Sequence, residues 1–386
     1  MDKKICVYAI CKNEEKFVDK WLDSMQEADY IVVLDTGSTD GTYKKLKADK
    51  RVTTVVKKPI KPWRFDVARN ESMKLVPEDA DILVCTDLDE VFNPGWAKVI
   101  KDVWKDDTTR IFYRYAWSHN EVGEPQDIFR YDKIHTRDYH WVYPVHEVLY
   151  PIKPDFYEHI VDVLDKVYLH HYPDKSKPRS YYFDLLKLST EENPNDSHVR
   201  MLLAREYVVR DEWDKALEEF LEVLKMPDVD QPNKRLVLLY SLFQTAIIYE
   251  HFKNYDEALW YCQEFIKEDP TYREPYLLMG EVYNSMKMYT LAEATVKAGL
   301  EYGVQKYDWV ERSTTWIWWP EDVLSISEFY LGKIDKAIEH VNACLAHAPS
   351  DTRLLKNALA FYKEKLKKTE ENNNKSSTTK DGVLNI

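Results

Sequence analysis

Glycine is scarce in this sequence. The 386 residues include only 9 glycines, whereas an average protein contains about 7%. The first four are Gly37, Gly41, Gly95 and Gly123, and the next is Gly280. Because glycine serves tight turns and loops, this distribution predicts a front half rich in loops and a back half that is mainly helical.

Three other absences exclude whole classes of protein. The net charge is −13, so the chain lacks the basic excess of proteins that wrap nucleic acid. The longest uncharged run, Leu236–Tyr249, is too short to cross a bilayer, and the start of the chain lacks the cleavage site of a signal peptide. The five cysteines are odd in number and lack metal-ligand spacing. We therefore expect reduced thiols, no transmembrane segment and a cytoplasmic protein.

The front third alternates strand and helix patterns. Apolar runs predict strands at Ile5–Ile10, Tyr30–Leu34, Val52–Val56 and Ile82–Cys85, and helical patterns lie between them. Such alternation is typical of a mostly parallel sheet, which binds ligands at the carboxyl ends of its strands. Further strands are expected at Ile111–Trp117 and Val167–His171, with an irregular, aromatic-rich segment between them.

The back half contains an internal repeat. A small residue, a tyrosine three positions later and an alanine nine positions after that recur three times, as Ala204/Tyr207/Ala216, Ala246/Tyr249/Ala258 and Gly280/Tyr283/Ala292. These units resemble tetratricopeptide repeats, which stack helix pairs into a solenoid. A generic helical bundle is the alternative. The polar tail contains few apolar side chains and is expected to be disordered. The predicted domains are therefore residues 1–178, 179–367 and a tail at 368–386.

The acidic run that follows the fourth strand carries the strongest chemical signal. It reads Asp87-Leu88-Asp89-Glu90. Two carboxylates one residue apart at a strand end can reach one divalent cation if the chain turns there, and such hard oxygen ligands suit Mg²⁺ or Mn²⁺. An acidic strand end that only aids solubility is the alternative for this motif by itself.

Two other segments place polar groups near the same edge. Asp35 ends an earlier strand before a turn, where it could accept a hydrogen bond from a base or ribose or simply form the turn. Asp66, Arg69 and Asn70 share one face of a helix. Arg69 could grip a diphosphate in bidentate fashion or pair with Asp66 at the surface.

Taken together, these motifs resemble family 2 glycosyltransferases, in particular bacterial and viral members that carry tetratricopeptide repeats and modify peptides or proteins. The resemblance rests on four segments in the same order and spacing, namely Ile10–Glu14, Leu34–Thr42, Phe65–Asn70 and Asp87–Glu90. It implies a GT-A fold with a Rossmann-like mixed sheet, followed by an all-α repeat domain. It also implies an inverting transfer of sugar from a nucleotide-diphospho-sugar, most often a UDP-sugar, with a divalent metal.

The resemblance also assigns residues. The nucleotide pocket would be lined by Asn13, Glu14, Asp35, Asp66, Arg69 and Asn70, with ribose and metal held by Asp87 and Asp89. His170 is the predicted third metal ligand, with His171 on the opposite face of its strand. Glu147 is the first candidate for the catalytic base, with Asp138 and Glu90 behind it. Glu147 could instead orient His146 or bind a sugar hydroxyl.

The acceptor would be a polypeptide or a glycan, and self-association into a homodimer is left open. The tryptophans of Trp316–Trp319 could line an acceptor groove, but we favour a role in packing a loop onto the repeats. Two other functions are weighed: a catalytically inactive nucleotide-binding scaffold whose repeats bind peptides, and another metal-dependent enzyme such as a nucleotidyltransferase or phosphohydrolase. The sequence contains neither a P-loop nor a Gly-x-Gly-x-x-Gly motif.

Overall fold

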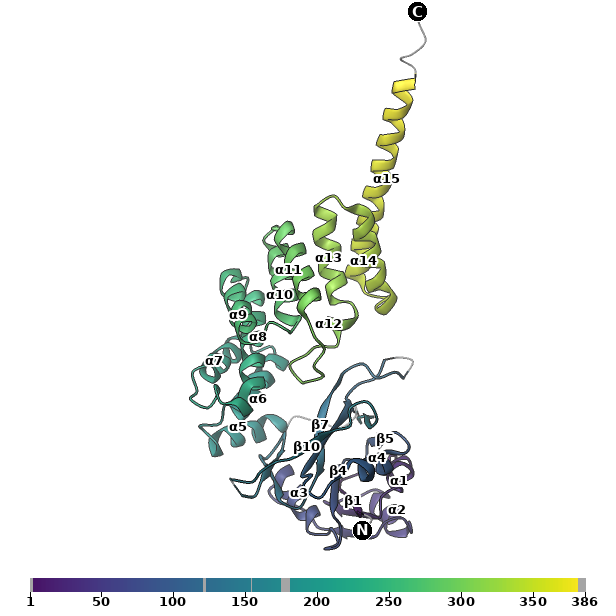
Figure 1. The fold of residues 1–386 in the computed structure, drawn as a ribbon, viewed down its shortest axis with the longest axis vertical. Coiled ribbons are helices and arrows are strands. Elements are labelled where there is room, and N and C mark those ends of the chain that lie inside the picture. The colour runs from purple at the N-terminus through teal and green to yellow at the C-terminus, as the bar shows by residue number, and fades with distance from the viewer. Residues whose placement is uncertain (1–2, 121–122, 154, 175–180, 381–386) are drawn as a thin grey trace, which may run out of the picture. The chain divides into compact units, whose positions relative to one another are not determined.

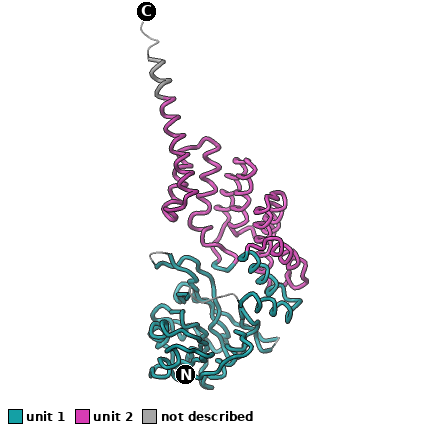
Figure 2. The backbone as a smooth tube through the Cα atoms, turned by 180° about the vertical axis from the view of Figure 1, so that it is seen from behind, with its two compact units in different colours: residues 1–210, 307–309 teal, residues 211–306, 310–386 magenta. Residues whose placement is uncertain are grey.

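A computed structural model of the chain describes residues 3–120, 123–153, 155–174 and 181–380. The chain divides into two compact units (Figure 2). Unit 1 contains Met1–Arg210 with Tyr307–Trp309, and unit 2 contains Asp211–Lys306 with Val310–Ile386. This division falls later than the predicted boundary at residue 178, because the hairpin of helices α5 (Tyr182–Glu192) and α6 (Ser197–Val209) groups with unit 1.

Unit 1 is built on a mixed sheet (Figure 1). Four parallel strands form one side in the order β3 (Thr54–Lys57), β2 (Tyr30–Asp35), β1 (Ile5–Cys11) and β4 (Ile82–Thr86). These are the four strands that the apolar runs predicted. The sheet then continues through antiparallel β7 (Ile128–His135) to β6 (Arg110–Ala116), β11 (Tyr168–His171) and β5 (Glu90–Phe92). A small strand, β10 (Ile160–Asp162), also pairs with β6.

Helices cover both faces of this sheet. On one face, α1 (Val18–Met25) and α4 (Trp96–Val103) bury Trp21, Leu22 and Trp96 against β1 and β4. On the other face, α3 (Phe65–Met73) and the hairpin of β8 (Tyr139–Val142) and β9 (Val148–Pro151) cover Tyr8 and Cys85. Helix α2 (Thr42–Ala48) follows the turn after β2. The carboxyl ends of β1, β2 and β4 thus meet at one edge of the sheet.

The segment expected to be irregular contains strands β7 to β10. The prediction failed because charged side chains interrupt the apolar pattern of β7. These charges have partners within unit 1: Arg130 pairs with Asp162, Asp132 with Arg110, and Lys133 lies near Asp87. Arg110 and Lys133 are buried, whereas the Arg130–Asp162 pair is exposed to solvent. Pairing allows a strand to bury a charge that a hydrophobicity pattern would assign to solvent.

Unit 2 is a stack of helical hairpins (Figure 1). After α7 (Trp213–Val223) and a short 3₁₀ turn at Pro232–Lys234, three antiparallel pairs follow one another. They are α8 (Arg235–His251) with α9 (Tyr255–Glu268), α10 (Glu274–Ser285) with α11 (Tyr289–Tyr302), and α13 (Trp319–Tyr330) with α14 (Ile334–His347). The repeated small residues lie where helices approach closely: Ala246, Ala258 and Ala292 are fully buried. A Cβ atom added to Gly280 would lie 2.5 Å from Cγ2 of Val296.

The tryptophan cluster packs the loop before α13 onto unit 2, as the sequence favoured. Trp319 is buried with the α8–α10 core, and its indole donates to Glu281 over 2.7 Å. Trp316, in the short helix α12 (Thr314–Ile317), donates to Glu311 over 2.7 Å. These contacts are structural.

The last helix corrects the prediction for the tail. Helix α15 spans Thr352–Lys380, so the chain stays helical past residue 368, and residues 381–386 lie outside the described part. Its first half buries Leu354, Ala358 and Phe361 against α14. Lys and Glu, which are good helix formers, make up most of residues 363–371 and can continue a helix that packing has already started. The Asn, Ser and Thr residues that follow do not explain its last turns.

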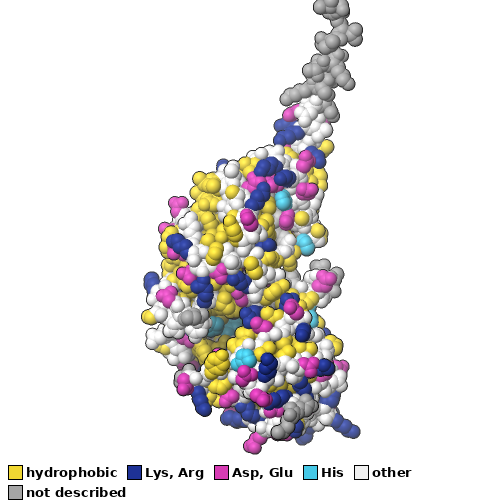
Figure 3. Space-filling view, viewed as in Figure 1, with side chains coloured by type: hydrophobic (Ala, Val, Ile, Leu, Met, Phe, Trp, Pro, Cys, Tyr) yellow, Lys and Arg dark blue, Asp and Glu magenta, His cyan; other side chains and the backbone are white. Residues whose placement is uncertain are grey.

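The structure also describes the surface charge, the cysteines and the length of the apolar helices. On the face drawn in Figure 3, Lys and Arg side chains lie interspersed with Asp and Glu. All five cysteines are buried and form no disulfide. Within the described ranges, no helix is both long and apolar enough to cross a membrane.

Candidate active site

The site lies where β4 ends and β5 begins. Asp87 and Asp89 occupy the turn between these two strands, and β11 runs antiparallel to β5 so that His171 is opposite Glu90. Helix α3 faces the same turn through Arg69. Residues far apart in sequence therefore meet beside the acidic motif.

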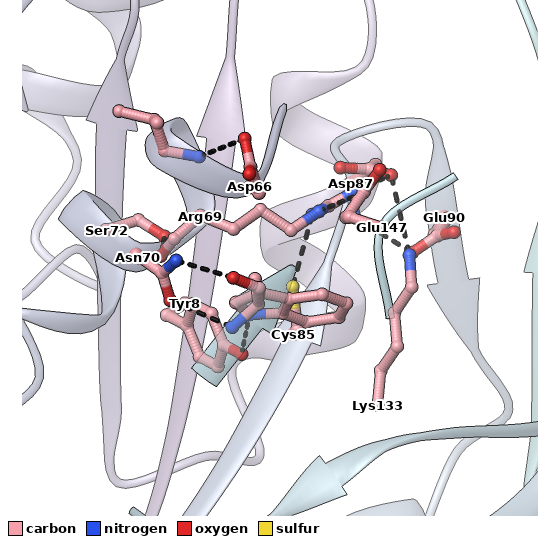
Figure 4. Close-up of polar contacts among 12 residues, drawn as sticks. Tyr8, Asp66, Arg69, Asn70, Ser72, Cys85, Asp87, Glu90, Lys133 and Glu147 are labelled. Atoms are coloured by element: carbon pink, nitrogen blue, oxygen red, sulfur yellow. Dashed lines mark hydrogen bonds and ion pairs between the residues drawn. The ribbon is translucent and has the colours of Figure 1, made fainter. Parts of the chain in front are cut away.

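Arg69 is the centre of a buried ion network (Figure 4). Its side chain is 3% exposed. Nη2 donates to Asp87 Oδ2 over 3.0 Å, Nη1 contacts the Cys85 sulfur at 3.1 Å, and Nε donates to Glu147 Oε1. The guanidinium also lies over the Trp141 ring. Each of its nitrogens has a partner inside unit 1. Arg69 therefore fixes the acidic motif and does not present a free pair of N–H donors to a diphosphate.

A second buried cation, Lys133, approaches the same carboxylate. It comes from β7 and is 4% exposed. Its Nζ lies 3.9 Å from Asp87 Oδ2 and 4.7 Å from the centre of the Tyr131 ring. Sequence reasoning missed this residue, because a single lysine in an aromatic-rich strand carries no motif.

These cations set the protonation of the acidic motif. Burial alone would raise the pKa of Asp87, but the charges of Arg69 and Lys133 outweigh it and hold that pKa well below its usual range. Asp87 is therefore ionised. Burial raises the pKa of Glu90, and Asp87 and Asp89 add to that rise while Lys133 opposes it. Glu90 is 1% exposed, accepts from the Tyr115 hydroxyl and from the Asp87 backbone, and thus holds the turn.

Asp89 faces His171. Asp89 Oδ2 lies 3.5 Å from His171 Nε2, and the other ring nitrogen, Nδ1, lies 3.2 Å from the Trp117 carbonyl oxygen. If Nδ1 donates to that carbonyl, a neutral ring presents the Nε2 lone pair to the carboxylate. Two electron-pair donors then face each other, an arrangement that calls for a proton or a metal cation between them.

The structure places His171, and not His170, beside Asp89. His170 lies on the other face of β11, where its Nδ1 is 3.0 Å from His119 Nε2. The prediction that His170 and His171 lie on opposite faces of the strand is correct, but His171 rather than His170 lies on the face of Asp89. The antiparallel register of β5 and β11 decides it, and that register is not visible in the sequence.

The residues predicted for the nucleotide pocket mostly brace loops. Asp35 is fully buried, and its Oδ1 accepts from the backbone of Gly37 and Ser38 at 2.8 and 2.7 Å. Asn13 Oδ1 accepts from the Thr39 backbone at 2.7 Å, and the Glu14 backbone donates to the Thr42 hydroxyl at 2.7 Å. These bonds join the loop after β1 to the loop after β2. A base contact by Asp35 would require its turn to open.

Two more residues predicted for the nucleotide pocket form hydrogen bonds within unit 1. Asp66 pairs with Arg64 through both oxygens, at 3.0 and 2.8 Å, rather than with Arg69. The Asn70 amide donates to the Trp141 carbonyl at 2.8 Å and accepts from the Trp141 backbone at 2.9 Å. Asn70 therefore anchors β8 to α3 through both its amide nitrogen and its amide oxygen.

The two candidate bases differ in position. Glu147 is in the site, but its carboxylate is paired with Arg69 and its side chain is 9% exposed. Asp138 is not in the site. Strand β7 runs antiparallel to β4 with His135 opposite Leu83, so Asp138 lies beyond the amino end of β4, at the opposite edge of the sheet from Asp87.

Comparison with known proteins gives one family match and several distant structural likenesses. Residues 6–149 match the model of glycosyl transferase family 2. No curated protein matches the chain. Among solved structures, similar proteins include a tetratricopeptide repeat protein from Parabacteroides merdae, at 18% identity, covering 47% of this chain and 64% of that chain with a TM-score of 0.36. A thermophilic tetratricopeptide repeat protein of Thermus thermophilus is 19% identical, covering 47% and 88% with a TM-score of 0.35.

At these TM-scores the solved structures are distant likenesses, and this chain spans less than two thirds of the first one. The family match is the firmer finding, since it contains Asp35, Arg69, Asp87 and Asp89. It supports a glycosyltransferase activity. Residues 6–149 thus match a family 2 glycosyltransferase domain, and they contain most of a mixed sheet that is followed by a region of helical hairpins.

Proposed function

We propose that this protein is an inverting, metal-dependent glycosyltransferase that moves a sugar from a UDP-sugar to a polypeptide or glycan acceptor. The observation that carries the proposal is the family 2 match over residues 6–149, which includes the acidic motif at the end of β4. The different partners of the two aspartates in that motif support the proposal. Asp87 is neutralised internally by Arg69, whereas Asp89 is not part of that pairing.

A divalent metal fits the Asp89–His171 pair. Both side chains are mostly buried, at 19% and 8% exposed, and an oxygen and an imidazole nitrogen are ligands that Mn²⁺ accepts. Among the residues that the structure describes, no group of three or more Asp, Glu, His or Cys side chains could hold a metal. Two protein ligands suit an ion whose shell is completed by water and substrate phosphates. When bound, such an ion neutralises negative charge on a leaving diphosphate.

The remaining side chains position these groups. Glu147 and Asp87 hold Arg69 from two sides, and Arg69 thereby fixes the turn that presents Asp89. The Glu147 carboxylate accepts from Arg69 Nε and is 9% exposed, so it is held within the network rather than directed at an acceptor. We therefore propose Glu147 as a positioning residue rather than the catalytic base.

The experiment measures hydrolysis of UDP-sugars with and without Mn²⁺. Asp89→Ala should abolish metal-dependent turnover, whereas Asp102→Ala, an exposed carboxylate on α4 that pairs with Lys98, should leave it unchanged. Turnover of Asp89→Ala at the wild-type rate contradicts the mechanism. Turnover of bare nucleotides or phosphomonoesters, with no sugar moved, would indicate a phosphohydrolase instead.

A binding measurement distinguishes this proposal from the alternative of a catalytically inactive scaffold. Isothermal titration of the wild-type chain with UDP and Mn²⁺ should give saturable heat if the domain is a working transferase. A chain that binds neither UDP nor Mn²⁺, and turns over no donor, would contradict the proposal.

A further inference from the structure

Two cavities lie near the start of α1 in unit 1, and one of them is beside the acidic motif. That one, of about 370 Å³, is lined by Lys16, Lys20, Asp89 and Tyr172 among others. The other, of about 420 Å³, is lined by Asn13, Lys16 and Lys45 together with the carboxylates of Glu15, Asp40 and Asp174. Lys16 belongs to both walls. Cavities of this size match the lower range of small-molecule sites.

The proposed function requires a protein cation that can bind the diphosphate of the donor. Most cations near the acidic motif are already paired within unit 1. Arg69 and Lys133 are 3% and 4% exposed, and both are directed at Asp87. A diphosphate could reach them only by breaking the network.

Lys20 differs from these residues. It is exposed and lines the same cavity as Asp89. In the described part of the chain it forms no ion pair, and its Nζ lies 3.4 Å from the centre of the Tyr172 ring. Lys16, one helical turn earlier, pairs with Asp174 over 2.8 Å. The aromatic ring holds the Lys20 ammonium in place without neutralising its charge.

We propose that Lys20 binds the diphosphate of the nucleotide-sugar donor in the cavity beside Asp89. This inference rests on the proposed function and adds the protein cation that receives the leaving group. An ammonium with three donors can bond phosphate oxygens directly, and charge-assisted bonds of this kind are among the stronger hydrogen bonds in proteins.

The test compares nucleotides that differ only in phosphate number. Wild-type protein is titrated calorimetrically, in the presence of Mn²⁺, with UDP, GDP and dTDP, and the tightest diphosphate is then compared with its monophosphate. Lys20→Met keeps the apolar stem over Tyr172 but removes the charge. It should weaken diphosphate binding roughly 10-fold, which corresponds to about 1.4 kcal/mol, and leave monophosphate binding within about twofold. Lys20→Arg should retain most of the affinity.

Lys98→Met is the matched control, because Lys98 is exposed on α4, pairs with Asp102 and changes the net charge equally. Its diphosphate affinity should equal that of wild type. If Lys20→Met binds the diphosphate as tightly as wild type, or weakens monophosphate and diphosphate equally, the inference is overturned while the proposed function stands. If wild-type protein binds none of the three diphosphates, both are overturned.

Discussion

Replacing Arg69 with Met tests whether the ion network holds the acidic turn in place. Arg69 is 3% exposed, and its removal would leave Asp87 and Glu147 mostly buried with one partner fewer each. Breaking a buried ion pair by removing one partner typically costs 3–5 kcal/mol, because the remaining charge lies uncompensated. We expect Arg69→Met to destabilise unit 1 by about 3–5 kcal/mol.

Arg64→Met provides the matched control. Arg64 also contacts two carboxylates, those of Asp66 and Glu192, but it is 22% exposed. Ion pairs that solvent reaches contribute roughly 0–1 kcal/mol, and salt screens them. The two variants therefore differ in burial more than in number of partners.

The assay is urea unfolding followed by far-UV circular dichroism, with hydrogen exchange of the α3 and β8 peptides to locate the change. The double variant Arg69→Met/Glu147→Gln should recover part of the loss, with a coupling energy of roughly 1 kcal/mol or more, since paired residues are not additive. Equal destabilisation by Arg69→Met and Arg64→Met, or additivity within about 0.5 kcal/mol, would refute the reasoning.

Three further predictions concern other parts of the chain. Burial raises the pKa of Glu274 from 4.5 to about 7. The free energy of unfolding of unit 2 should therefore fall by up to about 3 kcal/mol as pH rises from 4.5 through 7. Glu274→Gln should flatten that pH dependence in thermal unfolding measured between about pH 5 and 8. Gly280→Ala should destabilise unit 2 by roughly 1–3 kcal/mol, since the added Cβ would lie 2.5 Å from Val296, and an unchanged urea midpoint would contradict the close packing. His171→Asn should weaken Mn²⁺ binding roughly 10–100-fold if His171 is a ligand, whereas His170→Asn should leave it within about twofold in the same titration; the reverse order would restore His170 as the ligand.

The sequence predicted the architecture well wherever a local pattern determined it. Four apolar runs marked the parallel strands, and the spacing of Ala246, Ala258, Gly280 and Ala292 marked close helix contacts. Strand β7 was missed because its charges are paired inside the unit. Such pairing depends on long-range contacts that no window of sequence contains.

The site was predicted in part. The sequence placed Asp87 and Asp89 at a strand end, which the structure bears out. It could not reveal that Arg69 is bonded on every side, that Asn70 binds the β8 backbone, or that Asp138 lies at the opposite edge. The contacts of Asn70 and of Arg69 with Glu147 depend on the separate β8–β9 hairpin, and the place of Asp138 depends on the direction of β7.

The register of β5 and β11 sets the smallest piece of the chain that could hold the site together. The family match ends at residue 149, but among the strands that the structure describes β5 pairs only with β11, which begins at Tyr168. A fragment cut at 149 would keep every acidic motif, yet it would lose His171 and leave the strand that carries Glu90 without its neighbour. The boundary of sequence similarity is therefore not a folding boundary, and a shortened enzyme must extend through β11.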